Sequence, residues 1–220
     1  MTEIIKKIII LTDSTGSPRR DINNEFVDLD QTFPYLLKKK YQNCKFWQLS
    51  FSSISTKRLL AEAQAYLPDW KPDLIIVHSG INDCKPSVFS ERSLKIIIKK
   101  LGRFSKYLKY IIYNPFFIKI FNNTSSTPKN FNRDINIFKS YFKNSKIIWT
   151  EISCLTTLNI RFPGVLKNQA DFNYILKNNF GDNFVEISED LKKENGFLKD
   201  GLHYNSDGHN IIFEKISKKL

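Results

Sequence analysis

Residues 73–83 read Asp-Leu-Ile-Ile-Val-His-Ser-Gly-Ile-Asn-Asp, an apolar run that passes directly into a polar turn. A strand that is apolar at nearly every position is typical of a parallel sheet, because helices cover both faces of such a sheet. We therefore predict a buried strand over 73–78. The turn after it is expected to face a ligand, since ligands of open α/β sheets bind at the carboxyl ends of the strands.

Other apolar runs of strand length alternate with segments of helical periodicity along the chain. This alternation predicts an α/β fold, a three-layer α/β/α sandwich around a central parallel sheet of about five strands. The length of 220 residues suits a single domain, 1–220. The expected strands are 4–11, 45–49, 73–78, 146–150 and 184–187, and the expected helices are 33–41, 56–67, 165–180 and 207–220.

The segment between the third and fourth strands, residues 92–144, interrupts this alternation. Its first part, 92–122, is helical, rich in lysine and strongly aromatic, and a polar stretch over 122–130 follows it. We expect a helical insert that caps the sheet, with the alternative that the apolar run 116–121 packs on the sheet. A third interpretation is an amphipathic helix that contacts a membrane surface or a partner.

The composition indicates which binding partners and which cellular compartment to expect for this protein. The chain has 34 Lys and Arg against 22 Asp and Glu, a net charge of +12, which favours polyanions such as an anionic polysaccharide or the phosphates of CoA. No zinc-finger pattern or compact arginine patch accompanies this charge, so nucleic acid is not an expected partner. No run approaches the roughly 18 apolar residues of a membrane span. The apolar run 8–11 is too short for a secretory signal, so we expect a cytoplasmic protein with no transmembrane segment.

Three polar windows, far apart in sequence, carry candidate chemistry. Ser14 follows the first strand, where its hydroxyl can stand at the sheet edge. Asn82 follows the third strand and supplies an amide donor that cannot lose its proton, which suits a developing oxyanion. Asp200 and His203 lie three residues apart, so the carboxylate can orient the imidazole and leave its other nitrogen free to accept a serine proton. The windows of Ser14 and Asn82, each taken alone, are more typical of ordinary turn and helix-capping residues.

The chain has only three histidines, so few residues compete for the role of general base. His78 ends a buried strand, and His209 lies in the first turn of the last predicted helix. Both positions are typical of histidines with a structural role, which leaves His203 as the candidate base.

Together the windows resemble the sequence blocks of the SGNH/GDSL hydrolase superfamily. Residues 12–14 (Thr-Asp-Ser) resemble its Gly-Asp-Ser block, 80–83 (Gly-Ile-Asn-Asp) its Gly-x-Asn-Asp block, and 200–203 (Asp-Gly-Leu-His) its Asp-x-x-His block. The three blocks occur in the family's order, and the resemblance spans nearly the whole chain. It implies a flavodoxin-like SGNH fold and a serine esterase or O-acetyltransferase.

The resemblance also implies a role for each matching residue. Ser14 would attack the ester carbonyl, His203 would act as general base and then as general acid, and Asp200 would hold the imidazole. The oxyanion hole would combine the Ser14 backbone N–H, the Asn82 side chain and a backbone N–H from the family's second block. Gly80, where a backbone can approach closely, is a further candidate for the oxyanion hole.

Two positions depart from the family pattern. Thr12 stands where the first block has glycine, and we expect it to narrow the space beside the nucleophile. The second block, residues 50–56, lacks its glycine, and Ser53 is the best match for that position. Serine supplies the same backbone N–H, but the required backbone conformation is less favourable without glycine. This departure bears on the catalytic rate more than on the reaction class.

The resemblance leaves the substrate open among several classes. Small members of the family often act on carbohydrate acetyl groups, so we expect hydrolysis of an O-acetyl or other short acyl ester, with no cofactor and no metal. An O-acetyltransferase that uses acetyl-CoA to modify a bacterial surface polysaccharide or its precursor is the alternative. A lipid or thioester hydrolase, favoured by the apolar run 116–121, and a non-catalytic carbohydrate-binding module, favoured by the missing glycine, also remain open.

Overall fold

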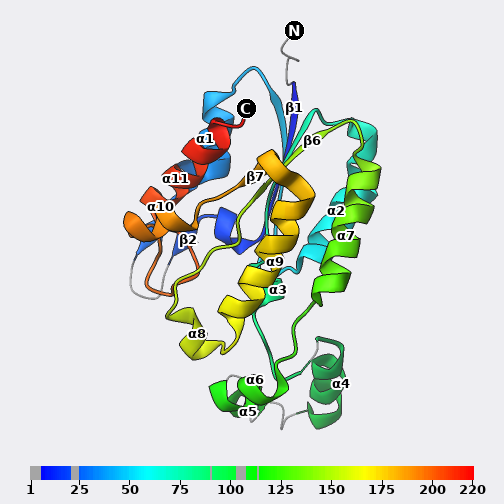
Figure 1. Ribbon diagram of the computed structural model, residues 1–220, viewed down its shortest axis with the longest axis vertical. Coiled ribbons are helices and arrows are strands. Elements are labelled where there is room, and N and C mark those ends of the chain that lie inside the picture. The colour runs from blue at the N-terminus through cyan, green and yellow to red at the C-terminus, as the bar shows by residue number, and fades with distance from the viewer. Residues whose placement is uncertain (1–5, 21–24, 90, 103–107, 113) are drawn as a thin grey trace.

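The computed structural model describes the chain except for residues 1–5, 21–24, 90, 103–107 and 113. Its central sheet has five parallel strands, as the sequence predicts, and their order is β4-β1-β5-β6-β7 (Figure 1). The first strand is described from residue 7 onward and the last is shorter than expected. The strands are β1 (Lys7–Thr12), β4 (Lys45–Ser50), β5 (Leu74–His78), β6 (Lys146–Thr150) and β7 (Phe184–Val185).

The strand order reverses at β1, which pairs with β4 on one side and with β5 on the other. In open α/β sheets such a reversal opens a crevice at the carboxyl ends of the strands, and ligands bind there. The residues that follow β1 and β5 therefore lie at the position where this architecture places a site.

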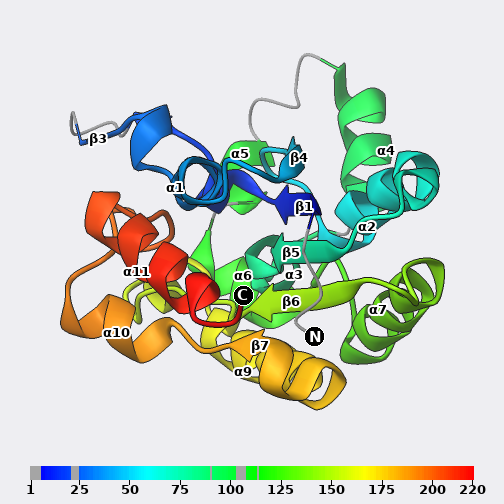
Figure 2. The ribbon, with the colours of Figure 1, turned by 90° about the horizontal axis from the view of Figure 1, so that it is seen from above.

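Helices cover both faces of the sheet (Figures 1 and 2). Neighbouring residues of β1 point to opposite cores: Ile8 and Ile10 to one, Ile9 and Leu11 to the other. The layer over Ile9 contains α2 (Thr56–Tyr66), α7 (Pro128–Tyr141) and α9 (Val165–Phe180), and the opposite layer contains α1 (Phe33–Lys40), α10 (Ser188–Lys193) and α11 (Ser206–Ser217).

The insert that the sequence predicts between the third and fourth strands divides into two parts. Helices α4 (Glu91–Leu101), α5 (Leu108–Ile112) and α6 (Pro115–Phe121) form a cap segment beyond the carboxyl ends of the strands, at the bottom of Figure 1. In contrast, α7 is a regular layer helix whose Phe131, Ile135 and Phe138 belong to the core.

The apolar run of α6 does not pack on the sheet. Phe116 is 66% exposed and Phe121 is 53% exposed, whereas Ile118 is buried. At the base of the cap segment, Ser87 and Asn123 pair through two backbone hydrogen bonds of 2.7 and 3.0 Å. Within the described ranges, no helix combines the length and the apolarity that a membrane crossing demands.

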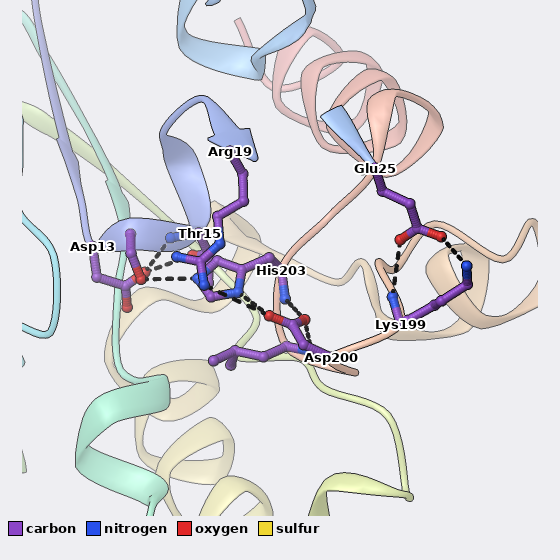
Figure 3. A network of polar contacts seen from close by, with 9 residues as sticks. Asp13, Thr15, Arg19, Glu25, Lys199, Asp200 and His203 are labelled. Carbon is purple, nitrogen blue, oxygen red and sulfur yellow. Dashed lines mark hydrogen bonds and ion pairs between the residues drawn. The ribbon is translucent and has the colours of Figure 1, made fainter. Parts of the chain in front are cut away.

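A second, two-stranded sheet follows the turn after β1 and was not predicted from the sequence. It pairs β2 (Arg19–Arg20) with β3 (Phe26–Val27) in antiparallel orientation. Glu25 ties this ribbon to the loop near the C-terminus, because its carboxylate accepts the Lys199 N–H at 3.2 Å and pairs with the Lys199 ammonium at 3.2 Å (Figure 3).

Candidate active site

Ser14 opens a short 3₁₀ turn, η1 (Ser14–Gly16), directly after the central strand β1. The Asp13 carboxylate stabilises this turn. It accepts the Thr15 N–H at 3.0 Å and the Thr15 hydroxyl at 2.6 Å (Figure 3). Burial raises the pKa of Asp13, and the two bonds from Thr15 act against that rise. The turn is therefore held by buried side-chain contacts, and Ser14 lies partly exposed at the carboxyl end of the sheet.

The three side chains that the sequence analysis paired lie in one chain of contacts. Ser14 Oγ is 3.1 Å from His203 Nε2, and His203 Nδ1 is 2.5 Å from Asp200 Oδ2. The other oxygen of Asp200 accepts the backbone N–H groups of Leu202 and His203, each at 2.9 Å. Burial raises the pKa of Asp200, but the hydrogen bonds from His203 and these N–H groups outweigh it and hold the pKa well below its usual range. Asp200 is therefore charged at neutral pH.

The loop that carries Asp200 and His203 depends on a glycine. Gly201 has φ +70°, and a Cβ at this position would lie 3.2 Å from Thr157 Oγ1 and 3.3 Å from Leu155 Cβ. The carbonyl of Gly201 accepts the Leu155 N–H at 2.8 Å, and the carbonyl of His203 accepts the Leu198 N–H at 2.8 Å. These contacts fix the loop against the segment that follows β6, and so fix the imidazole over Ser14.

The other two histidines are buried within the fold and make contacts elsewhere. His78 Nδ1 lies 2.5 Å from Thr150 Oγ1, and His209 Nδ1 accepts the Phe33 N–H at 3.3 Å. Burial lowers the pKa of His78 to about 3 and that of His209 to about 4, so both are neutral at pH 7. Their positions agree with the structural role expected from the sequence.

Asn82 and Ser53 line the cavity beside Ser14. The Asn82 amide donates to the Ile54 carbonyl at 3.0 Å. Ser53 has φ +55°, in the left-handed region that favours glycine, which agrees with the glycine expected at this position of the family's second block. Among the described residues, no acceptor takes a hydrogen bond from the backbone N–H of Ser14 or of Ser53. Both N–H groups are therefore available to a ligand in the cavity.

Gly80 and Thr12 lie outside this cavity. Gly80 precedes α3 (Ile81–Cys84) at φ +134°, and a Cβ there would come within 2.4 Å of Ile152 Cδ1. The position therefore has no room for a side chain, and the turn before α3 packs closely against Ile152. Thr12 does not narrow the space beside Ser14, contrary to our expectation, because its hydroxyl contacts Ser50 Oγ at 2.7 Å and its side chain lies against Gly16.

Asp83, the last residue of the second window, is structural. It is fully buried, and it accepts the Thr56 N–H at 2.7 Å at the start of α2 and the Ser125 hydroxyl at 2.8 Å. Burial raises the pKa of Asp83, and the bonds from Thr56 and Ser125 lower it. Asp83 therefore ties α2 and the chain that returns from the cap segment to the turn that carries Asn82.

The cavity beside Ser14 has a volume of about 220 Å³, and part of its lining was not found by sequence reasoning. Lys85 and Arg161 follow strands β5 and β6, so the rule that sites gather at strand ends could have found them. Arg19 lies on the two-residue strand β2, where no periodicity marks it. The described residues contain no cluster of His, Cys, Asp or Glu side chains suited to a metal ion. The newly identified lining residues are Arg19, Ser52, Lys85, Leu158, Arg161, Phe162 and Leu202.

Solved structures with this fold include several esterases. The chain is similar to a lipase/acylhydrolase from Enterococcus faecalis, with a TM-score of 0.66, 13% identity and coverage of 98% of this chain and 95% of that one. It is also similar to an acetylxylan esterase from Geobacillus stearothermophilus, solved as a catalytic mutant, with a TM-score of 0.63, 14% identity and coverage of 97% and 93%. At such identities the likeness shows the fold alone. A comparison with curated proteins finds no match.

The family model of GDSL-like lipases/acylhydrolases matches residues 21–216. The match begins after Ser14, so the assignment of the nucleophile depends on the geometry of the site and on the block at 12–14. The matched range covers most of the chain and includes Asn82, Asp200 and His203. The protein therefore belongs to the GDSL-like lipase/acylhydrolase family.

Proposed function

We propose that the protein hydrolyses an O-acetyl or other short acyl ester of a carbohydrate through an acyl-enzyme on Ser14. The observation that carries this proposal is the continuous contact from Ser14 through His203 to Asp200, beside a cavity of about 220 Å³. A hydroxyl, an imidazole and a charged carboxylate in this order are the parts that nucleophilic acyl transfer requires.

The reaction proceeds in two halves. His203 Nε2 accepts the Ser14 hydroxyl proton while Oγ attacks the ester carbonyl, and the resulting imidazolium then protonates the departing alcohol oxygen. Water enters, loses a proton to His203 and attacks the acyl-serine, which releases the carboxylic acid and restores Ser14. Asp200 accepts the Nδ1–H of His203 throughout, so it fixes the tautomer and stabilises the imidazolium.

The negative charge on the carbonyl oxygen requires donors that are aimed in advance. We assign this role to the backbone N–H groups of Ser14 and Ser53 and to the Asn82 amide. An amide nitrogen carries two hydrogens, and the bond from Asn82 to the Ile54 carbonyl occupies one and orients the other. Such preorganised donors stabilise the transition state more than the ground state.

The size and polarity of the cavity support a short acyl group on a carbohydrate. Three serines and Asn82 supply hydroxyl and amide groups to its lining, and Leu158, Phe162 and Leu202 form the apolar part. The lining also contains the cations Arg19, Lys85 and Arg161. Hydroxyl and amide groups match the hydrogen-bonding needs of a sugar, and an aromatic ring such as Phe162 offers it a flat apolar contact. The likeness of the fold to an acetylxylan esterase agrees with this substrate class.

The experiment measures acetyl release from 4-nitrophenyl acetate and from acetylated xylan, with and without acetyl-CoA and a free sugar acceptor. We expect release that needs no acceptor and that is lost in Ser14→Ala. Ser140→Ala, at an exposed serine of α7, is the matched control and should retain full activity. Acetyl transfer to the sugar that outpaces hydrolysis would instead establish the O-acetyltransferase with acetyl-CoA as donor. No release from any ester, by a folded protein, would favour a non-catalytic carbohydrate-binding module.

A lipid ester is a second candidate, and the cap segment favours it. This segment lies beyond the carboxyl ends of the strands (Figure 1), the end of the sheet at which Ser14 follows β1. Its exposed side chains include large apolar residues and Lys99, Lys100 and Lys119. An apolar surface with lysines around it suits contact with an anionic membrane. A series of 4-nitrophenyl esters from acetate to palmitate, with and without anionic vesicles, separates the candidates: preference for long chains on vesicles favours the lipid. The exposed apolar residues are Ile96, Ile98, Tyr110, Ile111, Phe116, Ile120 and Phe121.

A further inference from the structure

Three cationic side chains surround the cavity beside Ser14. Arg19 comes from β2, Lys85 follows α3, and Arg161 ends the short helix α8 (Leu158–Arg161). Asp200 is the single carboxylate among the described residues that line this cavity, and His203 already occupies it. The lining therefore carries an excess of positive charge directly beside the nucleophile.

The positive charge of Arg19 is only partly compensated by neighbouring groups. Its Nη2 is 3.9 Å from Asp200 Oδ2, which is beyond hydrogen-bond distance (Figure 3). Its Nε is buried and has no hydrogen-bond partner within the described part of the chain. No described residue accepts a hydrogen bond from the guanidinium, which is partly exposed and lines the cavity, so its other nitrogens can donate to an anion there.

Lys85 and Arg161 form a second cationic position in the lining of the cavity, and both contact the ring of Phe162. Lys85 Nζ is 5.9 Å from the centroid of the Phe162 ring, and Arg161 Cζ is 5.2 Å from the same centroid. Neither forms an ion pair with a carboxylate among the residues that the structure describes. Burial lowers the pKa of Lys85. The charge of Asp13 raises this pKa, and the charge of Arg161 lowers it. A desolvated ammonium beside a guanidinium is stabilised by an anion that reaches both.

We propose that the substrate is an anionic ester, with a carboxylate, phosphate or sulfate group held by Lys85 and Arg161 while Ser14 attacks the acyl carbon. This inference rests on the proposed ester hydrolysis and adds to it the charge of the substrate. Arg19, which also faces Asp200, contributes to the field at the carbonyl. An acidic polysaccharide and the phosphates of a thioester donor both carry the required anion.

Matched ester pairs test this directly. One pair places the charge on the leaving group: 4-acetoxybenzoate against its methyl ester. The other places it on the acyl group: the 4-nitrophenyl hemisuccinate against 4-nitrophenyl butyrate. A preference within the first pair would place the anion on the leaving group, and a preference within the second pair would place it on the acyl group. We expect kcat/KM to favour the anionic member of at least one pair by about tenfold at low salt, since a charge-assisted hydrogen bond contributes on that scale.

Variants separate the cavity cations from the general charge of the protein. Arg161→Gln and Lys85→Gln should each lower the ratio of anionic to neutral kcat/KM by about threefold or more. Arg133→Gln, at an exposed arginine of α7 that lines no part of the cavity, is the matched control and should leave the ratio unchanged. The wild-type preference should also fall as salt is raised, because salt screens partly exposed charges, and this measurement needs no variant.

The outcomes distinguish this inference from the proposed function. Turnover of neutral and anionic members at equal rates, with ratios unchanged by salt and by either variant, would overturn the anionic substrate and leave ester hydrolysis standing. A folded protein that turns over none of the four esters would remove the proposed function, and the anionic substrate with it.

Discussion

Two regions at the same end of the sheet differ in how the fold holds them. The triad region, which comprises the turn after β1 and the loop 200–203, is held by the carboxylates of Asp13 and Asp200 and by backbone hydrogen bonds. The cap segment joins the body near the paired residues Ser87 and Asn123 and leaves much of its apolar surface exposed. The fold thus fixes the proposed reacting groups firmly, whereas it leaves the cap surface available for contact.

The largest effect is expected at the imidazole of the triad region. His203→Ala should lower kcat by about 10⁴-fold or more, because the hydroxyl of Ser14 then has no base, and Asp200→Asn should leave a small residual activity. Steady-state kinetics on 4-nitrophenyl acetate measures both effects. If His209→Ala proved as damaging in folded protein, the assignment of the base to His203 would be wrong.

The next effect concerns the oxyanion donor. Asn82→Ala should lower kcat by about 10²- to 10³-fold while KM changes little, since the amide contacts charge that develops only in the transition state. Asn82→Asp should be as damaging, because a carboxylate would face the developing oxyanion. A rise in KM with unchanged kcat would show that Asn82 binds the ground state instead.

The buried histidines should make the fold sensitive to acid. The pKa of His209 is lowered to about 4 in the folded protein, so between pH 6.5 and 4 the unfolded chain binds more protons than the folded one. Stability is therefore full above about pH 6.5 and is lost as the pH falls, on the order of 3 kcal/mol from His209 by pH 4. Urea unfolding of wild type and His209→Asn at several pH values measures this, and equal pH slopes in the two proteins would contradict it.

A smaller effect is expected at Ser53, which stands in the left-handed region without being glycine. Ser53→Gly should relieve this strain and raise the free energy of unfolding by up to about 1 kcal/mol. Ser52→Gly is the matched control, because Ser52 does not have a positive φ, and it should destabilise the protein slightly. Equal effects of the two substitutions on urea unfolding would show that the Ser53 backbone carries no strain.

The smallest effect on stability is expected in the cap segment. Phe116→Ser should change the free energy of unfolding by less than about 0.5 kcal/mol, because the ring is largely exposed. Phe131→Ser, in the buried layer helix α7, is the contrasting control and should destabilise the protein by several times as much. A large loss of stability in Phe116→Ser would mean that the cap surface is covered in solution.

The sequence was sufficient for the parallel sheet and for the contact between Ser14, Asp200 and His203. Long β-branched runs mark buried strands, and residues that follow parallel strands meet at one edge whatever their distance in sequence. The ribbon of β2 and β3 was missed because strands of two residues carry no periodicity, and Arg19 was missed with it. The helix α7 was grouped with the insert, although the spacing of Phe131, Ile135 and Phe138 is that of a core-facing helix.

The expectations for Thr12 and Gly80 did not anticipate how these residues pack, because a sequence motif does not record packing. The Thr12 side chain turns away from the cavity because Ser50 offers its hydroxyl a partner on the neighbouring strand. Gly80 lies close to Ile152, so its lack of a side chain permits the packing of this turn against the segment that follows β6. Motif positions indicate which residues approach the site, whereas the side to which each one points depends on its neighbours in the fold.

The central claim is that His203 activates Ser14 as the nucleophile, and a fluorophosphonate probe tests it most directly. Peptide mass spectrometry after the reaction should find a single adduct, on Ser14, which is absent in Ser14→Ala and forms far more slowly in His203→Ala. An adduct on a different residue, or the same labelling rate in His203→Ala as in wild type, would contradict the account.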